Sequence, residues 1–328
     1  MTTTAASAVP VLDVRNLKTG FHTERGWVTA VDDISISIEA GKTLGLVGES
    51  GCGKSVTGYS LMRLIASPGR IAGGEVLVEG VDLLKLSEKQ MRQYRGGRIA
   101  MVFQEPMTSL DPLYMVQDPL LETLAIHRGI RGAAARREAE SLLEQVAIPG
   151  AARRLTSYPH QFSGGMRQRI LIATALAGKP RVLVADEPTT ALDVTVQAQI
   201  LALLRQLQSE TGTAILLITH NLGIVAENCH HVAVMYAGRI VERAPVRNLF
   251  DRPSHPYTRG LLAAIPGPLT TPRTLLPAIP GTVPSLHNLP SGCRFRNRCS
   301  MAAARCAQEV PLLRELGPGH FAACHFAD

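Results

Sequence analysis

A glycine-rich stretch in the first sixth of the chain has the residue types that bind phosphates. It reads Gly48-Glu49-Ser50-Gly51-Cys52-Gly53-Lys54-Ser55 and fits the pattern G-x-x-x-x-G-K-[ST]. The glycines let consecutive backbone N–H groups curl around an anion, and the N-terminus of a following helix adds its positive dipole end. We expect Lys54 to pair with the β- and γ-phosphates of a nucleotide and the Ser55 hydroxyl to ligate Mg²⁺. Cys52 stands at a variable motif position, where we expect a small filler residue.

Two adjacent acids follow an apolar run farther along the chain. The run Val182-Leu183-Val184-Ala185 leads into Asp186 and Glu187. Strand alternation separates the roles of the two acids: Asp186 is suited to hold Mg²⁺ through water, and Glu187 to polarise an attacking water as a general base. The alternative is a solvated D-E-P turn without a chemical role.

A second glycine-rich helix start lies at Ser163-Gly164-Gly165, just before the helical stretch MRQRILIATALA. Such a start offers backbone N–H groups and a positive dipole end to an anion. The sequence therefore predicts two phosphate-binding helix starts in one chain.

These ordered motifs resemble those of the ATP-binding cassette (ABC) family, over roughly Leu12 to Leu262. The resemblance implies that the S-G-G signature caps the γ-phosphate of an ATP bound by a partner subunit, so that a second ATPase subunit completes each site. The family's usual Gln after S-G-G is Met166 here. This change removes one polar side chain and leaves the backbone N–H groups, so we expect hydrolysis to survive.

The resemblance also assigns roles to four further positions. It makes Phe21 the aromatic residue that stacks on adenine, with Trp27 as the competing candidate. It implies that Gln104, in MVFQEP, senses Mg²⁺ and the attacking water and touches the transmembrane partner. It implies that Asp193, in TTALD, crosses the dimer interface and that His220, in LLITHN, contacts the γ-phosphate.

Four of the six cysteines fall near the C-terminus, separated by five, six and seventeen residues: Cys293, Cys299, Cys306 and Cys324. Four thiolates hold a [4Fe–4S] cluster or a tetrahedral zinc. Zinc favours close C-x₂₋₄-C pairs, which are absent here, so we favour the cluster; zinc and free thiols remain as alternatives. Interleaved arginines are expected to offset the thiolate charge. Cys229 is expected to be a small buried hydrophobe.

Composition is that of a soluble globular protein, with 45% hydrophobic and 19% charged residues in 328. The net charge of +7 suits contact with anions such as nucleotides, acidic lipids or nucleic acid. No apolar run approaches the length of a bilayer span, and the N-terminus lacks the features of a signal peptide. We therefore expect a cytosolic protein with at most a peripheral membrane role.

The elements that must position these residues alternate between strands and helices. Short alternating bursts over Val11 to Ile38 predict a small antiparallel β subdomain, and Pro119 to Leu176 predicts an inserted helical subdomain. Apolar strands at Thr43 to Val47, Val182 to Ala185 and Ala214 to Thr219 predict a parallel sheet. The expected fold is an α/β phosphate-loop NTPase core spanning residues 11–262. A Pro-rich linker and Cys-rich extension follow in residues 263–328.

A narrower resemblance, to the ATPase subunits of di- and oligopeptide importers, rests on FSGGMRQR, on His255-Pro256-Tyr257 and on the Cys-rich end. It implies ATP-driven peptide uptake through two transmembrane permease subunits, with an extracytoplasmic binding protein as an indirect partner. It also implies a place on the cytoplasmic face of the cell membrane and no nucleic-acid partner. Import of nickel or another small solute, or a soluble cassette protein acting on ribosomes or DNA, are the alternatives. By itself, His255-Pro256-Tyr257 indicates only a turn before a helix.

Overall fold

The chain folds into two units, each assembled from segments that lie far apart in the sequence. The computed structural model describes residues 9–105, 109–190, 192–265 and 277–327. Within these limits, the first unit takes Met1–Asp13, Ser37–Lys42 and Val76–Leu217, and the second takes Val14–Ile36, Thr43–Glu75 and Ile218–Asp328. Part of the predicted linker, residues 266–276, lies outside the described residues.

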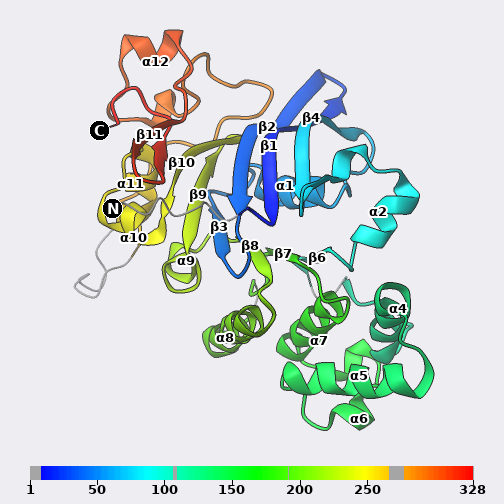
Figure 1. Cartoon of the computed structure of the whole chain (residues 1–328). Helices are drawn as coiled ribbons and strands as arrows, with labels where there is room; N and C mark the ends of the chain where they lie inside the picture. The colour runs from blue at the N-terminus through cyan, green and yellow to red at the C-terminus, as the bar shows by residue number, and fades with distance from the viewer. Residues whose placement is uncertain (1–8, 106–108, 191, 266–276, 328) are drawn as a thin grey trace, which may run out of the picture. The chain divides into compact units, whose positions relative to one another are not determined.

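The inserted helical subdomain of the first unit forms as predicted. Its helices are α4 (Gln117–Arg128), α5 (Gly132–Gln145), α6 (Ala151–Arg154) and α7 (Gly164–Ala177), which gather in one group (Figure 1). In α5 the buried residues Ala135, Ala139 and Leu142 recur at helical spacing. This spacing gives the helix one apolar stripe, which packs against α4 and α7.

Three strands form the sheet of the first unit, and one of them ends at the predicted acid Asp186. They are β6 (Ile99–Val102), β7 (Val182–Asp186) and β8 (Ala214–Ile218), in the order β8-β7-β6, with β6 and β7 parallel. All residues of these strands are buried, as expected for parallel strands covered on both faces. The unit's other elements are β5 (Val81–Asp82), α2 (Glu88–Tyr94), α8 (Val194–Thr211) and short 3₁₀ turns at Leu83–Lys85 and Pro159–Gln161.

A five-strand array runs through the second unit in the order β11-β12-β10-β9-β3. Its strands are β3 (Thr43–Val47), β9 (His231–Tyr236), β10 (Arg239–Pro245), β11 (Arg314–Gly317) and β12 (His320–Ala322). The β3–β9 pair is parallel, and the remaining pairs are antiparallel. The last two strands of the chain thus extend the array beyond β10.

The long strands β1 (Leu12–Thr23), β2 (Gly26–Ile38) and β4 (Gly69–Val78) lie in the order β2-β1-β4. The alternating burial of β1 and β2 matches the pattern predicted over Val11 to Ile38, whereas β4 was not predicted from the sequence. The helices of the second unit are α1 (Lys54–Leu61), α9 (Leu222–Asn228), α10 (Val246–Asp251), α11 (Pro256–Ala263) and α12 (Ala304–Gln308), with a 3₁₀ turn at Arg296–Arg298.

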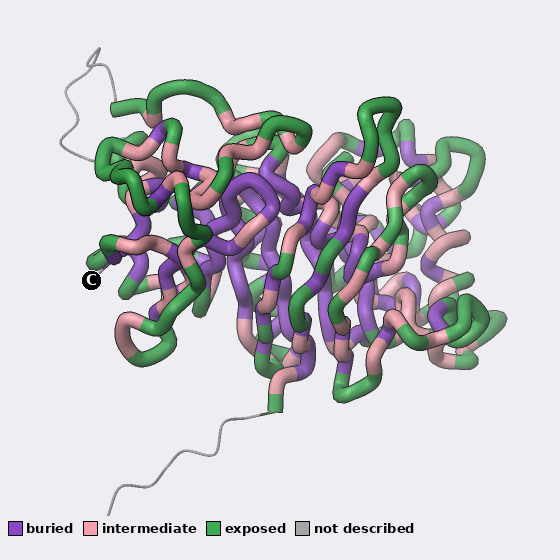
Figure 2. The backbone as a smooth tube through the Cα atoms, turned by 90° about the horizontal axis from the view of Figure 1, so that it is seen from above, coloured by how far each residue is buried: buried purple, intermediate pink, exposed green. Residues whose placement is uncertain are grey.

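The Cys-rich extension packs into the core of the second unit through Phe295. The Phe295 ring lies 5.2 Å from that of Tyr236 and 5.4 Å from that of Tyr257, and all three side chains are buried. Most other residues of the extension are exposed or half-buried, as the tube near the C-terminus shows (Figure 2). Phe295 therefore anchors this part of the extension in the core of the second unit.

The α/β class with an antiparallel subdomain is confirmed. Within the described ranges, none of the helices combines the length and the apolar character that a bilayer span requires.

Candidate functional site

The phosphate loop joins a buried strand to a helix, as its motif requires. Strand β3 ends at Val47, and α1 begins at Lys54. Gly53, the N-cap of α1, has φ 107° and offers no side-chain cap to the helix. The first N–H groups of α1 are therefore not satisfied by a capping side chain, which leaves them suited to an anion.

Glycine is required at two points of this loop. A Cβ atom on Gly53 would stand 2.4 Å from the carbonyl oxygen of Ala30, and one on Gly48 would stand 2.2 Å from that of Met235. Both residues also have positive φ, which side chains disfavour. The two glycines let the loop lie directly on neighbouring backbone, which fixes its path.

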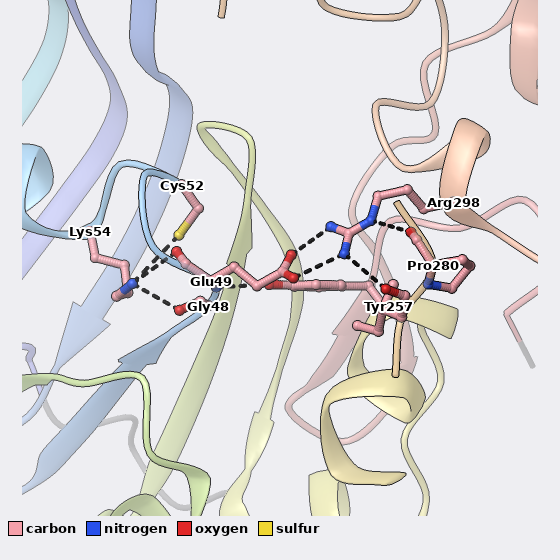
Figure 3. A network of polar contacts seen from close by, with 8 residues as sticks. Gly48, Glu49, Cys52, Lys54, Tyr257, Pro280 and Arg298 are labelled. Atoms are coloured by element: carbon pink, nitrogen blue, oxygen red, sulfur yellow. Dashed lines mark hydrogen bonds and ion pairs between the residues drawn. The ribbon is translucent and has the colours of Figure 1, made fainter. Parts of the chain in front are cut away.

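Lys54 is buried, at 6% exposed, and lies across the loop. Its Nζ donates to the carbonyl oxygens of Gly48, at 2.8 Å, and Glu49, at 3.1 Å, and lies 3.9 Å from Cys52 Sγ (Figure 3). Cys52 is 1% exposed, as a filler residue would be, and burial raises the pKa of its thiol. The loop thus concentrates one positive charge among backbone groups.

The two acids predicted from the sequence lie at the carboxyl end of β7 in the first unit. Asp186 ends the strand and is fully buried. Glu187 follows with φ 45°, a left-handed conformation that is uncommon outside glycine and recurs at functional sites.

Among the described residues, the side chains of Gln104 and Thr190 donate to the Glu187 carboxylate. Gln104 Nε2 donates to Glu187 Oε2 at 3.2 Å, and Thr190 Oγ1 donates to the same oxygen at 2.8 Å. Gln104 reaches this place because β6 and β7 are parallel and in register, with Val102 opposite Ala185. This role of Thr190 was not predicted from the sequence, although its place three residues after Glu187 is a usable signal. The group is arranged to orient a carboxylate.

The S-G-G signature begins α7. Ser163 is the N-cap, and its hydroxyl accepts a hydrogen bond from the backbone N–H of Met166 at 3.4 Å. Gly165 lies against Val196, where a Cβ atom would stand 2.5 Å from Val196 Cγ1. The Met166 backbone therefore serves the helix cap, whatever its side chain does.

The remaining polar candidates lie at element boundaries. Asp193 is the N-cap of α8, and its Oδ1 accepts from the Val196 N–H at 2.9 Å. His220 is exposed and follows β8 in the second unit. The dimer and phosphate roles of these two residues stay predictions.

Both candidates for adenine stacking already have neighbours within the second unit. Phe21 lies against Gly69, where a Cβ atom would stand 2.5 Å from the ring. The Trp27 ring lies 5.0 Å from the guanidinium carbon of Arg70 and 4.9 Å from the His22 ring. The choice between Phe21 and Trp27 stays open.

The four cysteines of the extension line one small cavity: Cys293, Cys299, Cys306 and Cys324. The Cys299 and Cys324 sulfurs each accept a backbone N–H at 3.4 Å, from Met301 and Phe326. Burial, together with the neighbouring cysteines, raises the pKa values of Cys293 and Cys299. Among the described residues, however, no group of three or more His, Cys, Asp or Glu side chains has the arrangement of a metal site.

The arginines between the cysteines are only partly available to offset thiolate charge, which corrects the expectation. Arg294 pairs with Asp32, Arg298 with Glu49 and Arg305 with Glu309. Arg296 differs, because it lines the cysteine cavity and its buried Nε has no hydrogen-bond partner among the described residues. A buried, unsatisfied cationic donor beside four thiols suits an anionic occupant.

Two residues of the C-terminal part of the chain contact the phosphate loop, and neither contact was predicted from the sequence. Arg298 forms a two-point ion pair with the Glu49 carboxylate, and Tyr257 Oη accepts from the Glu49 N–H at 2.9 Å (Figure 3). The His-Pro-Tyr motif marks Tyr257 in the sequence, but its spacing does not predict a contact with Glu49. The motif does precede a helix, since α11 begins at Pro256 with His255 as its N-cap.

Comparisons with known sequences show which proteins the chain resembles. The sequence model of the family described as ABC transporter matches residues 31–190, and that described as oligopeptide/dipeptide transporter, C-terminal region, matches residues 241–306. The chain is 51% identical to the "Probable peptide ABC transporter ATP-binding protein y4tR" of Sinorhizobium fredii, over 96% of this chain and 94% of that one. It is 50% identical, over 97% of both chains, to an ATP-binding protein of Brucella melitensis named for peptide import.

Comparisons with solved structures give the same result. The ATP-binding cassette MJ0796, in a dimeric post-hydrolysis state bound to ADP and phosphate, matches with a TM-score of 0.65 and 25% identity. That match covers 72% of this chain and 99% of the cassette. A component of the cbiONQ transporter complex from Clostridium perfringens matches with a TM-score of 0.62 and 26% identity, over 74% and 91% of the two chains. By its motifs, its fold and its half-identical relatives, the chain belongs to the ABC transporter family of ATPases.

Proposed function

We propose that this chain is the ATP-hydrolysing subunit of an importer of di- or oligopeptides. The observation that carries the ATPase part is the phosphate loop, with β3 before it, α1 after it and Lys54 across it. The match to the oligopeptide/dipeptide transporter C-terminal region over residues 241–306 supports the substrate class. The names of relatives at about 50% identity, which specify peptide transport, support it too.

The residues have separate tasks in the proposed reaction. Lys54 exchanges its contacts with loop carbonyls for the β- and γ-phosphates of ATP, and the first N–H groups of α1 bind the same phosphates. Glu187 accepts the proton of the attacking water, while Gln104 and Thr190 hold its carboxylate in place.

Mg²⁺ bound with ATP would neutralise the phosphate charge. Ser55, Asp186 and Gln104 would hold it, and their hydroxyl, carboxylate and amide oxygens are the donors that this ion prefers.

A second ATPase subunit, identical or homologous, completes each site in this proposal. Ser163 and Gly165 of one subunit contact the γ-phosphate held by Lys54 of the other, with Asp193 at the interface and His220 at the γ-phosphate. The helix start at Gly164 supports this role, because its backbone N–H groups suit an anion. Hydrolysis then resets the closed pair.

The ATPase assignment is tested by two variants of the purified full-length chain. Replacing Lys54→Ala should remove Mg–ATP binding and turnover. Replacing Glu187→Gln should leave ATP binding intact and lower kcat by about 10²-fold or more, because the general base is lost. Turnover at the wild-type rate in the Glu187 variant would remove Glu187 as the base, and Lys54-independent binding would contradict the assignment as a whole.

The transport assignment places the chain at the cytoplasmic face of the membrane, bound to two transmembrane permease subunits. A cell that lacks the chain should lose uptake of labelled di- or oligopeptides, and restoring the wild-type chain should recover it. Selective loss of nickel uptake would instead indicate a metal importer. Co-purification with ribosomes or DNA, without membrane proteins, would indicate a soluble cassette protein.

We also propose that the four cysteines of the extension hold a [4Fe–4S] cluster. Their convergence on one cavity supports this, as does the unsatisfied Arg296 Nε beside it. Bound there, the cluster would cross-link the extension through iron–thiolate bonds. Without a ligand the burial of Cys293 and Cys299 favours their neutral thiols, so ligation has to release protons.

Anaerobically purified protein tests this proposal. A cluster should give about four iron atoms per chain and an absorption band at about 400 nm, both lost when Cys306→Ser is introduced. Colourless protein with one zinc ion per chain would show that the cysteines bind zinc and not a cluster. Four thiols that titrate freely in metal-free protein would rule out both.

A further inference from the structure

We propose that Arg298, in the Cys-rich extension, is a positioning residue for the phosphate loop: it holds the Glu49 carboxylate away from Lys54 and the phosphates. The inference rests on the proposed role of this loop in binding ATP. Arg298 Nη1 donates to Glu49 Oε2 at 2.6 Å, and Nη2 donates to Glu49 Oε1 at 2.9 Å. Two parallel bonds of this kind fix both the place and the orientation of a carboxylate.

Arg298 is itself held firmly. Its side chain is 5% exposed, and its Nε donates to the Pro280 carbonyl oxygen at 2.9 Å. Its guanidinium lies 5.8 Å from the centre of the Tyr236 ring and 6.0 Å from that of Phe295. The hydrogen bond to Glu49 is the largest cause that raises the pKa of Arg298 above its usual range, so the guanidinium stays charged. The extension therefore presents a fixed cation to the loop.

Glu49 is also held at its backbone. Its N–H donates to Tyr257 Oη at 2.9 Å, and its carbonyl oxygen accepts from Lys54 Nζ at 3.1 Å. The Tyr257 side chain is fully buried. One peptide segment is thus fixed from three sides, by α11, by the extension and by the loop lysine (Figure 3).

The direction of the Glu49 carboxylate matters for electrostatic reasons. A carboxylate within a phosphate-binding loop repels phosphate and competes with it for the lysine ammonium. In Figure 3 the Glu49 carboxylate points toward Arg298 and away from Lys54. Without Arg298 the Glu49 side chain, which is 30% exposed, is free to turn toward the ammonium. Arg298 then acts on ATP affinity through Glu49 and touches no phosphate itself.

The test compares Arg298→Gln with wild type in the full-length chain. We expect KM for ATP to rise about ten-fold and kcat to change less than about three-fold, because breaking a largely buried charge pair acts on binding rather than on the base. Arg298→Lys should recover part of the loss, since an ammonium keeps the charge but not the two-point geometry. Arg305→Gln is the matched control: it breaks an exposed ion pair of the same extension, with Glu309, and should leave KM unchanged.

The decisive comparison uses Glu49→Gln as the background. If Arg298 acts by directing the Glu49 carboxylate, Arg298→Gln should have no further effect on KM once that carboxylate is gone. An equal rise in KM in both backgrounds would show a merely structural role and overturn the proposal. Amide exchange of residues 48–55 gives a readout that needs no turnover: it should increase in Arg298→Gln. Unchanged exchange there contradicts this proposal alone, whereas wild-type turnover that survives Lys54→Ala contradicts the ATPase assignment.

Discussion

No role was predicted for Thr190 from the sequence, yet its hydroxyl donates to Glu187 Oε2 at 2.8 Å, a shorter hydrogen bond than the one from Gln104. A carboxylate that removes a proton from water must point at that water. At the scale of single residues, the proposed role of Glu187 as general base therefore depends on the donors that orient its carboxylate.

We expect Thr190→Val, which keeps the shape and removes the hydroxyl, to lower kcat about ten-fold, the effect of losing one hydrogen bond to a charged group. KM for ATP should change by less than about two-fold, because Thr190 is expected to orient the general base and not to bind ATP. Steady-state ATPase kinetics measure both. Thr123→Val, which removes a hydroxyl that donates within α4, is the matched control; an unchanged kcat in the Thr190 variant would contradict the orienting role.

Cys229 is half-buried rather than fully buried as expected, and it provides a pH-dependent prediction. Burial raises the pKa of its thiol to about 12, and Gly45 lies against its sulfur. The folded state therefore keeps the thiol neutral, while the unfolded chain ionises above about pH 8.5. The stability from this neutral thiol is complete below that pH and is lost as the pH rises toward 12, by up to about 1.4 kcal/mol per pH unit.

Denaturant unfolding between pH 8 and 11 tests this prediction. Other groups also titrate in that range, so the measured quantity is the difference between wild type and Cys229→Ala. The alanine variant should be less stable at pH 8 and should lose less stability on alkaline titration. Parallel curves for the two proteins would show that the thiol does not contribute.

At the scale of elements, substitutions of Asp193 can distinguish its role as the N-cap of α8 from its proposed role at a dimer interface. Asp193→Ala should lower the free energy of unfolding by about 1 kcal/mol, because the first turn of α8 loses its cap. Asp193→Asn keeps a capping oxygen and should keep the stability. Thermal unfolding measures the cap, and ATPase activity of the asparagine variant then reports the charge alone; equal destabilisation by both substitutions would contradict the capping interpretation.

Elements that carry local patterns were predictable from the sequence. The strand, loop and helix around Lys54 follow from one apolar run and one glycine motif, and the apolar stripe of α5 follows from helical spacing. Local patterns could not predict two other contacts, the ring pair of Tyr257 and Phe295 and the ion pair of Glu49 and Arg298. Each joins residues far apart in the chain, and no spacing rule encodes such contacts. Alternation predicted the strands over Val11 to Ile38, but neither β4 nor the neighbours of Trp27.

At the scale of the whole chain, several buried contacts attach the extension to the core of the second unit, although most of its residues are exposed or half-buried. Besides the Phe295 contacts, the fully buried Glu242 carboxylate accepts from the backbone N–H groups of Ser254 and His255, at 2.7 and 2.9 Å. The same carboxylate lies 2.8 Å from His320 Nε2 of β12. One buried acid thus joins β10, the start of α11 and the last hairpin.

Phe295→Ala should therefore destabilise the second unit by about 3 kcal/mol or more, the usual cost of removing a large buried ring. Denaturant unfolding of the purified chain gives the value. Phe326→Ala is the matched control, because Phe326 is 40% exposed and its ring should contribute little. A loss below about 1 kcal/mol in the Phe295 variant would mean that the extension is held by other contacts.

The position of Arg298 has a practical consequence for handling the protein. Arg298 directly precedes Cys299 in the chain. One short turn therefore carries both a cysteine that lines the cavity and the guanidinium that pairs with Glu49. Air oxidation or proteolytic nicking of that turn should yield batches that look intact by fold yet differ in nucleotide affinity. Preparations are best compared only after their thiol content and C-terminal mass have been matched.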